Sequence, residues 1–351
     1  MKQLLPVFAR LRAKVVGNRP IAKCAAEVVE LSPATARMQP AAIALPGEFD
    51  RVLAVQEETT LAMERERVTA CERRHGPTLA YRIDNAVLGE GTLYYDGGYD
   101  VIRSHSTGAL LRGELDDFAE MQLCVNYVIE RYFGHWLVDG LCLELLAQRR
   151  SMPGLALARA PWLHESGYRE LVGLEVIRLR KARIRRLWVI DDRGINDGWI
   201  SRFQELRSRV RLGAKGEGAR RLMVTRGTLG AKRNLVNSSE VHAALERIGF
   251  EIVDPESETP GSLVGKLAAA EIVVAVEGSV QNHGLLAMPS GSIFVAIQPP
   301  DRFNAFAKAQ ADAAGIKWGY VVADSDPDGF CLPVERLLRT IDEATRVASL
   351  S

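Results

Sequence analysis

The chain has few cysteines, and their placement excludes two kinds of stabilised fold. Its 351 residues include only Cys24, Cys71, Cys124, Cys142 and Cys331, which are scattered and form no C-x-x-C pair. A disulfide framework or a zinc site is therefore not expected, and a reducing compartment fits this pattern better.

Long apolar runs and an excess of charge of one sign are also missing. No run approaches the roughly 20 apolar residues that a membrane span needs. The stretch MKQLLPVFARLRAK is apolar over only part of its length, because Arg10 and Arg12 interrupt it. The formal net charge is +1, so neither nucleic acid nor an anionic membrane is expected as the main partner. We expect a cytoplasmic protein, with peripheral association at the inner face of a membrane as the open alternative.

What remains is the composition of an ordinary globular protein. Hydrophobic residues make up 47% of the chain and charged residues 25%. A length of 351 residues exceeds what one compact core usually holds, so we expect two domains, residues 1–185 and 186–351. The last helix is assigned to the second domain, and packing against the first domain is the alternative.

The first half of the chain mixes extended and helical patterns. Residues 79–104 contain β-rich runs divided by Gly-Glu-Gly and Asp-Gly-Gly, which predict β-hairpins. A long helix is expected over residues 118–149, with an interruption near residues 132–134. A strand is expected at GLALARA and a short helix at HESGYRELVGL.

From about residue 186 the pattern becomes a strict alternation of strand and helix. Each apolar run of strand type is followed by a helical pattern, which predicts βαβ units and a parallel sheet. The runs are apolar throughout, as in strands covered on both faces. The expected strands are residues 185–190, 221–226, 250–254, 271–276, 292–297 and 318–323. Asn237 is expected to cap one of the helices, with Glu240 reaching back to it.

Two of these strands end in loops that could bind a phosphate, because ligands of open parallel sheets lie beyond the carboxyl ends of the strands. Thr225 and Arg226 follow one strand, and the cationic run Lys232-Arg233-Asn234 comes soon after. Glu277-Gly278-Ser279 follows another, where glycine lets backbone approach a ligand and the next helix offers amides. The alternative is a surface arginine loop and an ordinary turn, since no G-x-G-x-x-G or Walker motif is present.

RYFGHWLVDGLCLELL holds the best candidate for a general base. If Gly134 opens a helix, His135 and Asp139 share one face at i and i+4. A histidine oriented by a carboxylate can accept a proton in catalysis. The alternative is a core histidine satisfied by its neighbour.

Three further stretches have weaker interpretations. The run from Asp324 to Glu335 fits the calcium-loop spacing, but a strand-like flank and internal prolines favour an acidic turn before the last helix. Asp191-Asp192 could be a metal-binding pair, although a loop carboxylate is favoured. The basic run 178–186 is interpreted as a solvated linker or helix face, with a lipid or acidic partner as the alternative.

Six stretches, in this order, together resemble glycosyltransferase family 61, especially its bacterial capsule and lipopolysaccharide members. They are YFGHWLVDGL, LWVIDDRGINDGWISRF, MVTRGTLGAKRNLVNSSEV, LERIGFEIVDPE, AAAEIVVAVEGSVQNHGLLAMPSG and IQPPDRF. The resemblance implies an α/β fold of the glycosyltransferase-B type, with two Rossmann-like domains facing a cleft. It also implies inverting transfer without an obligatory metal or other cofactor. The first domain would bind a saccharide acceptor and the second a nucleotide-sugar donor, most readily a UDP-sugar.

The resemblance also assigns roles to residues. Thr225 and Arg226 match the family's strand-end contact to the donor diphosphate, and Arg233 and Asn237 match later residues of that block. Gly278 and Ser279 belong to the second donor-binding turn, which Asn282 and His283 follow. Ser238 and Glu277 depart from the family pattern, since many members carry Glu and His there. His283 could supply that imidazole or could cap the helix.

These residues define an expected mechanism. Arg226, the cationic loop and helix amides would stabilise the departing diphosphate. His135, oriented by Asp139, would deprotonate the acceptor hydroxyl, with Glu277 as the second candidate base. A nucleotide-sugar-binding protein without transfer activity, or a different α/β transferase, remains open, because a fold alone does not define a reaction.

Overall fold

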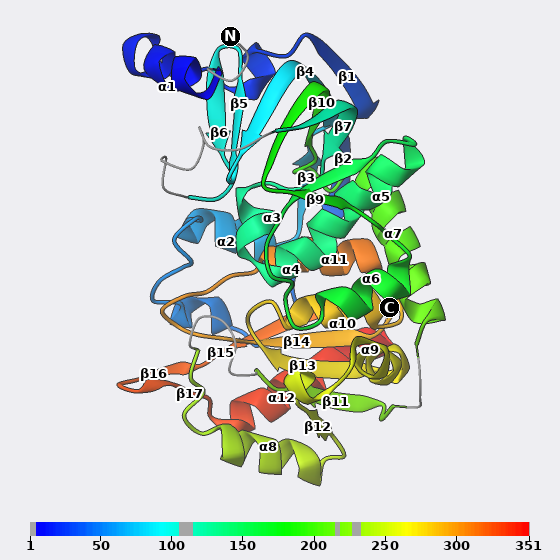
Figure 1. Ribbon diagram of the computed structural model, residues 1–351. Coiled ribbons are helices and arrows are strands. Elements are labelled where there is room, and N and C mark those ends of the chain that lie inside the picture. The colour runs from blue at the N-terminus through cyan, green and yellow to red at the C-terminus, as the bar shows by residue number, and fades with distance from the viewer. Residues whose placement is uncertain (1–4, 105–114, 215–217, 227–232, 351) are drawn as a thin grey trace. The chain divides into compact units, whose positions relative to one another are not determined.

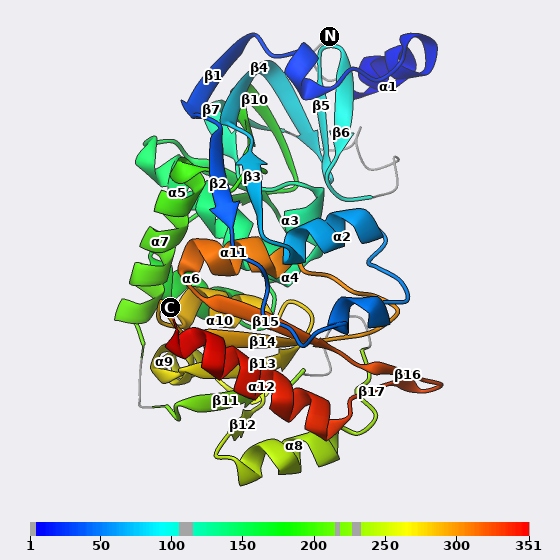
Figure 2. The ribbon, with the colours of Figure 1, turned by 180° about the vertical axis from the view of Figure 1, so that it is seen from behind.

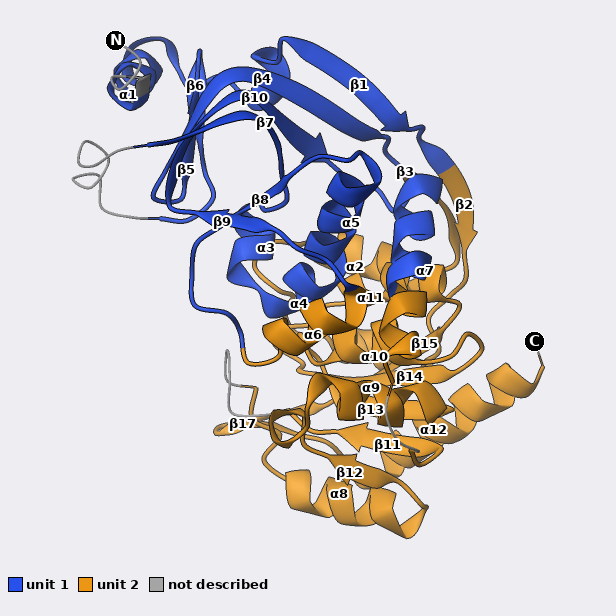
Figure 3. Cartoon of the chain, turned by 45° about the vertical axis from the view of Figure 1, so that its right-hand side comes forward, with its two compact units in different colours: residues 1–35, 75–162, 173–206 blue, residues 36–74, 163–172, 207–351 orange. Residues whose placement is uncertain are grey.

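The structure is a computed structural model that describes residues 5–104, 115–214, 218–226 and 233–350 (Figure 1). The chain forms two compact units (Figure 3). Unit 1 comprises residues 1–35, 75–162 and 173–206, and unit 2 comprises residues 36–74, 163–172 and 207–351. Within the described residues, no helix combines the length and the apolar character that crossing a bilayer requires.

Unit 1 is built on an eight-stranded mixed sheet with the order β6-β5-β4-β10-β7-β8-β9, and β1 pairs with β4. The strands are β1 (Glu27–Ser32), β4 (Thr78–Gly89), β5 (Thr92–Tyr95), β6 (Gly98–Val101), β7 (Asp116–Leu123), β8 (Gly154–Leu157), β9 (Ile177–Leu179) and β10 (Lys181–Asp191). β4, β5 and β6 form the two expected hairpins. The sheet departs from the all-parallel sheet expected of a Rossmann-like domain, because β10 runs antiparallel to β4 and parallel to β7.

The helices of unit 1 follow the sequence pattern only in part. They are α1 (Leu5–Val16), η2 (Ile21–Lys23), α3 (Tyr127–Arg131), α4 (Phe133–His135), the π-helical turn η5 (Trp136–Gly140), α5 (Leu141–Arg149) and the first part of α7 (Asp197–Leu212). The long helix expected over residues 118–149 is wrong at its beginning, where β7 lies. Phe118 and Met121 have helical spacing, but pairing with β10 overrides that local preference.

The strand β10 was expected to begin the parallel series of the second half, and this expectation is wrong. Over the first residues of β10, basic residues with some exposure alternate with buried apolar residues. A strand covered on both faces would lack that alternation. The basic run 178–186 is consequently strand rather than linker or helix, and Arg186 lies 2.8 Å from Glu120 of β7.

Unit 2 is built on a five-stranded, fully parallel sheet with the order β12-β11-β13-β14-β15. The strands are β11 (Arg221–Val224), β12 (Glu251–Val253), β13 (Ile272–Val276), β14 (Ile293–Gln298) and β15 (Lys317–Val322). The prediction of a parallel sheet from these five strands is confirmed. β13 and β14 are buried along their whole length, as expected for strands covered on both faces.

The remaining elements of unit 2 cover or border this sheet. They are η3 (Glu48–Arg51), α2 (Leu61–Val68), α6 (Glu165–Val172), α8 (Ser238–Arg247), η6 (Pro255–Ser257), α9 (Pro260–Ala269), α10 (Gln281–Ala287), α11 (Phe306–Ala314), α12 (Val334–Ser349) and the paired strands β2 (Thr35–Gln39) with β3 (Cys71–His75) and β16 (Asp324–Asp326) with β17 (Gly329–Cys331). Figure 2 shows α12 along the sheet.

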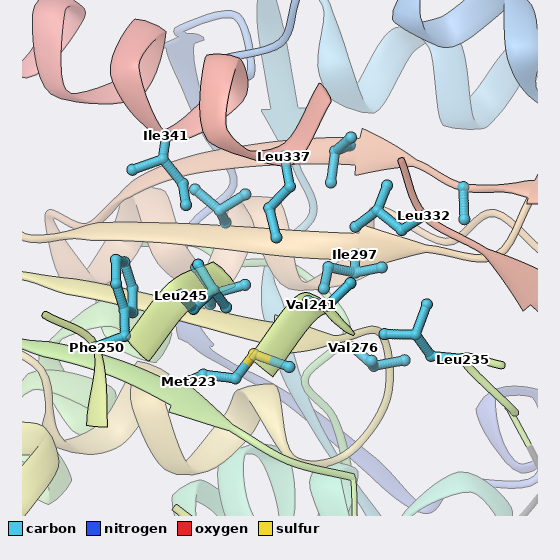
Figure 4. Packing of buried hydrophobic residues seen from close by; sticks show 14 of the residues in the cluster. Met223, Leu235, Val241, Leu245, Phe250, Val276, Ile297, Leu332, Leu337 and Ile341 are labelled. Atoms are coloured by element: carbon cyan, nitrogen blue, oxygen red, sulfur yellow. The ribbon is translucent and has the colours of Figure 1, made fainter. Parts of the chain in front are cut away.

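The core of unit 2 explains how α8 and α12 are held on the sheet. Leu337 and Ile341 of α12 and Leu245 of α8 are buried in one cluster with strand residues such as Val276 and Ile297 (Figure 4). Burying a side chain of this size contributes about 1.5–3 kcal/mol. The apolar faces of the two helices therefore fix the strand ends that carry the candidate site.

Two local expectations in unit 2 change with the structure. Asn237 makes no side-chain cap to α8, because its Oδ1 accepts from the Leu332 amide at 3.0 Å and its Nδ2 donates to the Leu332 carbonyl at 2.9 Å. Glu240 does reach back as predicted, and its Oε2 accepts from Asn237 Nδ2 at 3.1 Å. Residues 324–331 form the hairpin β16–β17, with two Asp324 oxygens 2.9 and 3.0 Å from Arg336. An aspartate so paired is a poor calcium ligand, and the acidic-turn interpretation is favoured.

Candidate active site

The first group of candidate residues lies in unit 1, on the helical segment that follows β7. His135 Nδ1 lies 2.7 Å from Asp139 Oδ2, which confirms the predicted i and i+4 contact. The side chains of His135 and Asp139 are 28% and 27% exposed. The pair is thus accessible to a small molecule while still being anchored to the protein.

A π-helical turn supports this pair. Trp136–Gly140 is wound as a π-helix between α4 and α5, and π-helical turns often occur at functional sites. Leu137, Leu141 and Leu145 are fully buried, so the opposite side of the segment is fixed in the core. The ring of Tyr132 lies 6.0 Å from the His135 ring and limits its movement.

The acidic pair after β10 does not form a metal site with other ligands. Arg193 binds both oxygens of Asp191, and Arg202 binds both oxygens of Asp192 at 2.7 and 2.6 Å. Thr78 Oγ1 also donates to Asp192 at 2.7 Å. Among the described residues, no group of three or more metal-binding side chains is present. The predicted loop carboxylate is therefore the better description.

The second group lies in unit 2, where the strand order reverses. From β11 the chain passes to β12 on one side and then to β13 on the other side of β11. The carboxyl ends of such neighbouring strands form the usual ligand site of a doubly wound sheet. Thr225 and Arg226 follow β11, and Glu277, Gly278 and Ser279 follow β13. The structure thus brings the two predicted loops together.

Glu277 holds a cluster of three arginines at this edge. Arg233 Nε lies 2.8 Å from Glu277 Oε2, and Arg302 Nη1 donates to the same oxygen at 3.4 Å. Arg226 Nη1 donates to the Glu277 carbonyl at 2.9 Å. Two of these arginines contact the carboxylate and the third binds the backbone of the same residue, so three cations lie around one carboxylate.

Burial of the arginine side chains and the repulsion between them make their charged forms less favourable. Burial lowers the pKa of Arg226, and Arg302 adds to that shift while Glu277 opposes it. Burial also raises the pKa of the Glu277 carboxyl, which is only 6% exposed, while the three arginines oppose the shift. An additional anion would relieve the repulsion among the arginines. Glu277 is the counterion of these arginines, and its role as a base stays a prediction.

Gly278 allows the arginines to lie against the backbone. Its φ of 141° is in a region that L side chains rarely adopt. A Cβ atom at this position would lie 2.1 Å from Arg226 Nη1 and 2.7 Å from Arg233 Nη1. The glycine is thus required both by its conformation and by the space that the guanidinium groups occupy.

The other residues of this turn differ from expectation. The amides of Gln281, Asn282 and His283 donate to the carbonyls of residues 278–280. Those amides are therefore engaged within the turn rather than offered to an anion. Thr225 and Ser279 are partly exposed, and the Thr225 amide donates to the Val253 carbonyl at 2.8 Å.

His283 is enclosed within unit 2. Its Nδ1 lies 2.6 Å from the Tyr168 hydroxyl, and its ring centroid lies 5.4 Å from that of His164. Burial lowers the pKa of His283 to about 3, so the imidazole is neutral near neutral pH. A buried neutral ring neither caps the helix nor contributes charge to a phosphate site.

Sequence reasoning missed Arg302. It follows β14, which lies beside β13, and IQPPDRF was noted without assigning it a role. The rule that selected Arg226 and Glu277, namely proximity to a strand's carboxyl end, also selects Arg302. Asn237 is engaged with Leu332, as described above, and Lys232 lies outside the described residues.

Together, the mixed α/β architecture, the cationic strand ends and the histidine–carboxylate pair are compatible with an α/β transferase. Residues 133–295 match the model of glycosyltransferase 61. This match suggests a role in glycosyl transfer, with binding of a sugar donor and an acceptor. The family also has eukaryotic members, so the narrower capsule or lipopolysaccharide type is not supported by the match. The chain matches no curated protein.

Proposed function

We propose that this protein is an inverting glycosyltransferase that moves a sugar from a nucleotide-sugar donor to a hydroxyl of a saccharide acceptor. Surface polysaccharide biosynthesis in the cytoplasm is the proposed setting. The observation that carries the proposal is the convergence of Arg226, Arg233 and Arg302 at the carboxyl ends of β11, β13 and β14.

The arginine cluster is assigned the diphosphate of the donor. Guanidinium groups bind phosphate oxygens through paired, charge-assisted hydrogen bonds. The Arg302 side chain is 34% exposed, and Arg226 is partly exposed, so both can reach a ligand. As the sugar–phosphate bond breaks, the leaving nucleoside diphosphate gains negative charge, and this cluster stabilises it.

The leaving group requires such stabilisation from protein side chains or from a metal. We propose that the guanidinium groups are sufficient, which makes the transfer metal-independent. A UDP-sugar is the proposed donor, on the basis of the family resemblance. Gly278 and Ser279 bring backbone and a hydroxyl to the same strand end, where ribose or sugar hydroxyls have polar partners.

The His135–Asp139 pair is assigned the acceptor hydroxyl. His135 Nδ1 contacts Asp139, so the other ring nitrogen, Nε2, is the atom that accepts the acceptor proton. The acceptor oxygen forms a bond to the anomeric carbon while the bond to the diphosphate breaks. A single displacement of this kind inverts the anomeric centre. Asp139 stabilises the imidazolium that results.

A ligand screen tests the proposal. Thermal unfolding would be measured with UDP, GDP, dTDP and CMP and with their sugars. A ligand at about 100 times its dissociation constant stabilises the folded state by about 2.7 kcal/mol. The expected result is a shift with one nucleotide family, reduced in Arg226→Ala and retained in the control Arg247→Ala, an exposed arginine of α8. The absence of a shift with every nucleotide would contradict the proposal.

Transfer to a saccharide panel separates an enzyme from a binding protein. With the nucleotide-sugar that shifts the melting temperature, the product's anomeric configuration would be read by NMR. Inversion, retained after treatment with EDTA, is the expected result. Binding without transfer to any acceptor would favour a nucleotide-sugar-binding protein instead.

A further inference from the structure

The helix α1 has two apolar faces, whereas a surface helix usually has one. The narrow face contains the small residues Pro6 and Ala9, and Ala9 is buried against Val87 and Tyr94 of the sheet in unit 1. The helix is therefore already docked on the protein. Its second apolar face is not needed for that docking.

The second face carries larger apolar side chains and is exposed. Phe8, Leu11 and Val15 recur at i, i+3 and i+7, so they line one side of the helix. Their exposed fractions are 58%, 54% and 83%. Val7, at the edge of this face, is 37% exposed. Isolated exposed apolar residues are ordinary, but a contiguous apolar patch usually marks an interaction surface.

Cations border this apolar face. At 100° per residue, Arg10 and Lys14 lie on one side of the face and Arg12 on the other. Arg12 and Lys14 are exposed. The helix has no acidic residue, although Asp96 of the β5–β6 turn lies 3.2 Å from Arg12.

The surrounding sequence has the same bias. Residues 1–26 contain no aspartate or glutamate, in a chain whose net charge is only +1. The cations of this segment are Lys2, Arg10, Arg12, Lys14, Arg19 and Lys23. A local excess of positive charge of this kind is attracted to anionic lipid headgroups.

We propose that the exposed face of α1 docks on an anionic lipid bilayer, with Phe8, Leu11 and Val15 inserted between headgroups and Arg12 and Lys14 bound to lipid phosphates. An apolar strip flanked by cations is the pattern of a helix that lies in the plane of the membrane interface. A second copy of the chain is a poorer occupant, since two such faces would bring Arg12 and Lys14 of both copies together. A 12-residue helix also offers a small area compared with a stable protein interface.

Vesicle binding of the full-length protein tests this proposal without reference to transfer activity. Cosedimentation would be measured with phosphatidylcholine vesicles and with vesicles that also contain about 30 mol% phosphatidylglycerol. Binding is expected to the anionic vesicles and to weaken as ionic strength rises. A wild-type protein that does not bind anionic vesicles at low salt would overturn the proposal.

Matched variants separate the two contributions. The triple change Phe8→Gln, Leu11→Gln and Val15→Gln is expected to lower partitioning about 100-fold. Removing the charges of Arg12 and Lys14, each to Gln, is expected to lower it about fivefold per residue on anionic vesicles alone. The control replaces three residues that are 73%, 88% and 76% exposed outside α1, namely Met38, Leu212 and Leu350, by Gln. An equal loss in the control would contradict a specific role of α1.

Melting temperature and sedimentation velocity complete the experiment. The α1 triple variant and the control triple are expected to melt like the wild type, because all six side chains are exposed. If the wild type self-associates and the α1 triple variant is monomeric, without vesicle binding by either, a second copy covers this face and the lipid proposal is wrong. Capture by an acidic protein without lipid binding would also overturn it.

Discussion

Two segments of this protein, each following a strand, both contain an imidazole and a carboxylate. In one segment the two groups contact each other, and in the other each binds a different partner. The segment after β7 contains His135 and Asp139, and the segment after β13 contains Glu277 in the turn and His283 in α10. In the first, the imidazole and the carboxylate contact each other at 2.7 Å. In the second, the carboxylate binds arginines while the imidazole binds the Tyr168 hydroxyl at 2.6 Å.

The difference shows that partners and burial determine what an imidazole can do. His135 is partly exposed, and its Nδ1 contacts the carboxylate of Asp139. His283 is buried beside a phenol, and burial raises the pKa of Tyr168 as it lowers that of His283. The first pair is partly exposed to solvent, whereas the second is a buried, neutral contact between α6 and α10.

The largest expected effect comes from breaking the exposed pair. His135→Ala should lower kcat by about 10²–10⁴ because it removes the proposed general base, with the nucleotide dissociation constant unchanged. Steady-state transfer assays and calorimetric nucleotide titration measure the two quantities. Asp139→Asn should lower kcat as well, since an amide cannot stabilise the imidazolium. His242→Ala on α8 serves as the matched control. Equal loss of nucleotide binding in His135→Ala would assign His135 to the donor instead.

The second test distinguishes a counterion from a base at Glu277. Glu277→Gln should lower the free energy of unfolding by about 3 kcal/mol, because it leaves the guanidinium group of Arg233, which is 10% exposed, without a carboxylate. Glu271→Gln is the matched control, since Glu271 and its partner Arg220 are 53% and 76% exposed, and the loss there should be below about 1 kcal/mol. Urea unfolding measures both. Full stability of Glu277→Gln with strongly reduced turnover would restore Glu277 as the candidate base.

The third test uses pH on the buried imidazole. The folded pKa of His283 is about 3, below its ordinary value of about 6.5, so its neutral form is favoured in the folded state. Its contribution to stability is therefore complete above pH 6.5 and is lost as pH falls toward 3. Between pH 7.5 and 5, this group alone should lower the free energy of unfolding by about 2 kcal/mol.

A double variant isolates this effect from other titrations. Tyr168→Phe with His283→Phe keeps both rings and removes the hydrogen-bonded atoms together, so no polar group is left alone in that pair. The pH dependence of urea unfolding should be shallower in the double variant by the same 2 kcal/mol, about one and a half decades in the unfolding constant. An unchanged pH profile would show that His283 does not titrate in this window.

Sequence reasoning succeeded where the pattern of apolar residues predicted the strands and the rule for parallel sheets predicted where a ligand binds. The five strands β11 to β15 were predicted from apolar runs, and the rule for parallel sheets selected Arg226 and Glu277 at adjacent strand ends. The contact of His135 with Asp139 followed from helical spacing alone. These features depend on local geometry, which a sequence specifies directly.

The features that were missed depend on tertiary partners. Asn237 was expected to cap α8, but Leu332 binds its side chain. His283 lies close in sequence to the turn after β13, yet Tyr168, over one hundred residues away along the chain, encloses it. Residues 118–121 formed a strand because β10 was available for pairing. No pattern within a short window contains this information.

The smallest expected effect concerns Gly278, which lies between Glu277 and His283 in the sequence. Gly278→Ala would place a methyl group where Arg226 and Arg233 lie, so the guanidinium groups should move and nucleotide affinity should fall about tenfold, or 1.4 kcal/mol. Gly249→Ala is the matched control, because its φ of 84° is also positive but no atom lies within 4 Å of the added carbon. Both variants should lose about 1 kcal/mol of stability through backbone strain, and only Gly278→Ala should lose affinity. If the two variants bind nucleotide equally well, the arginines are not the donor site, and the charge at the β13 turn serves stability alone.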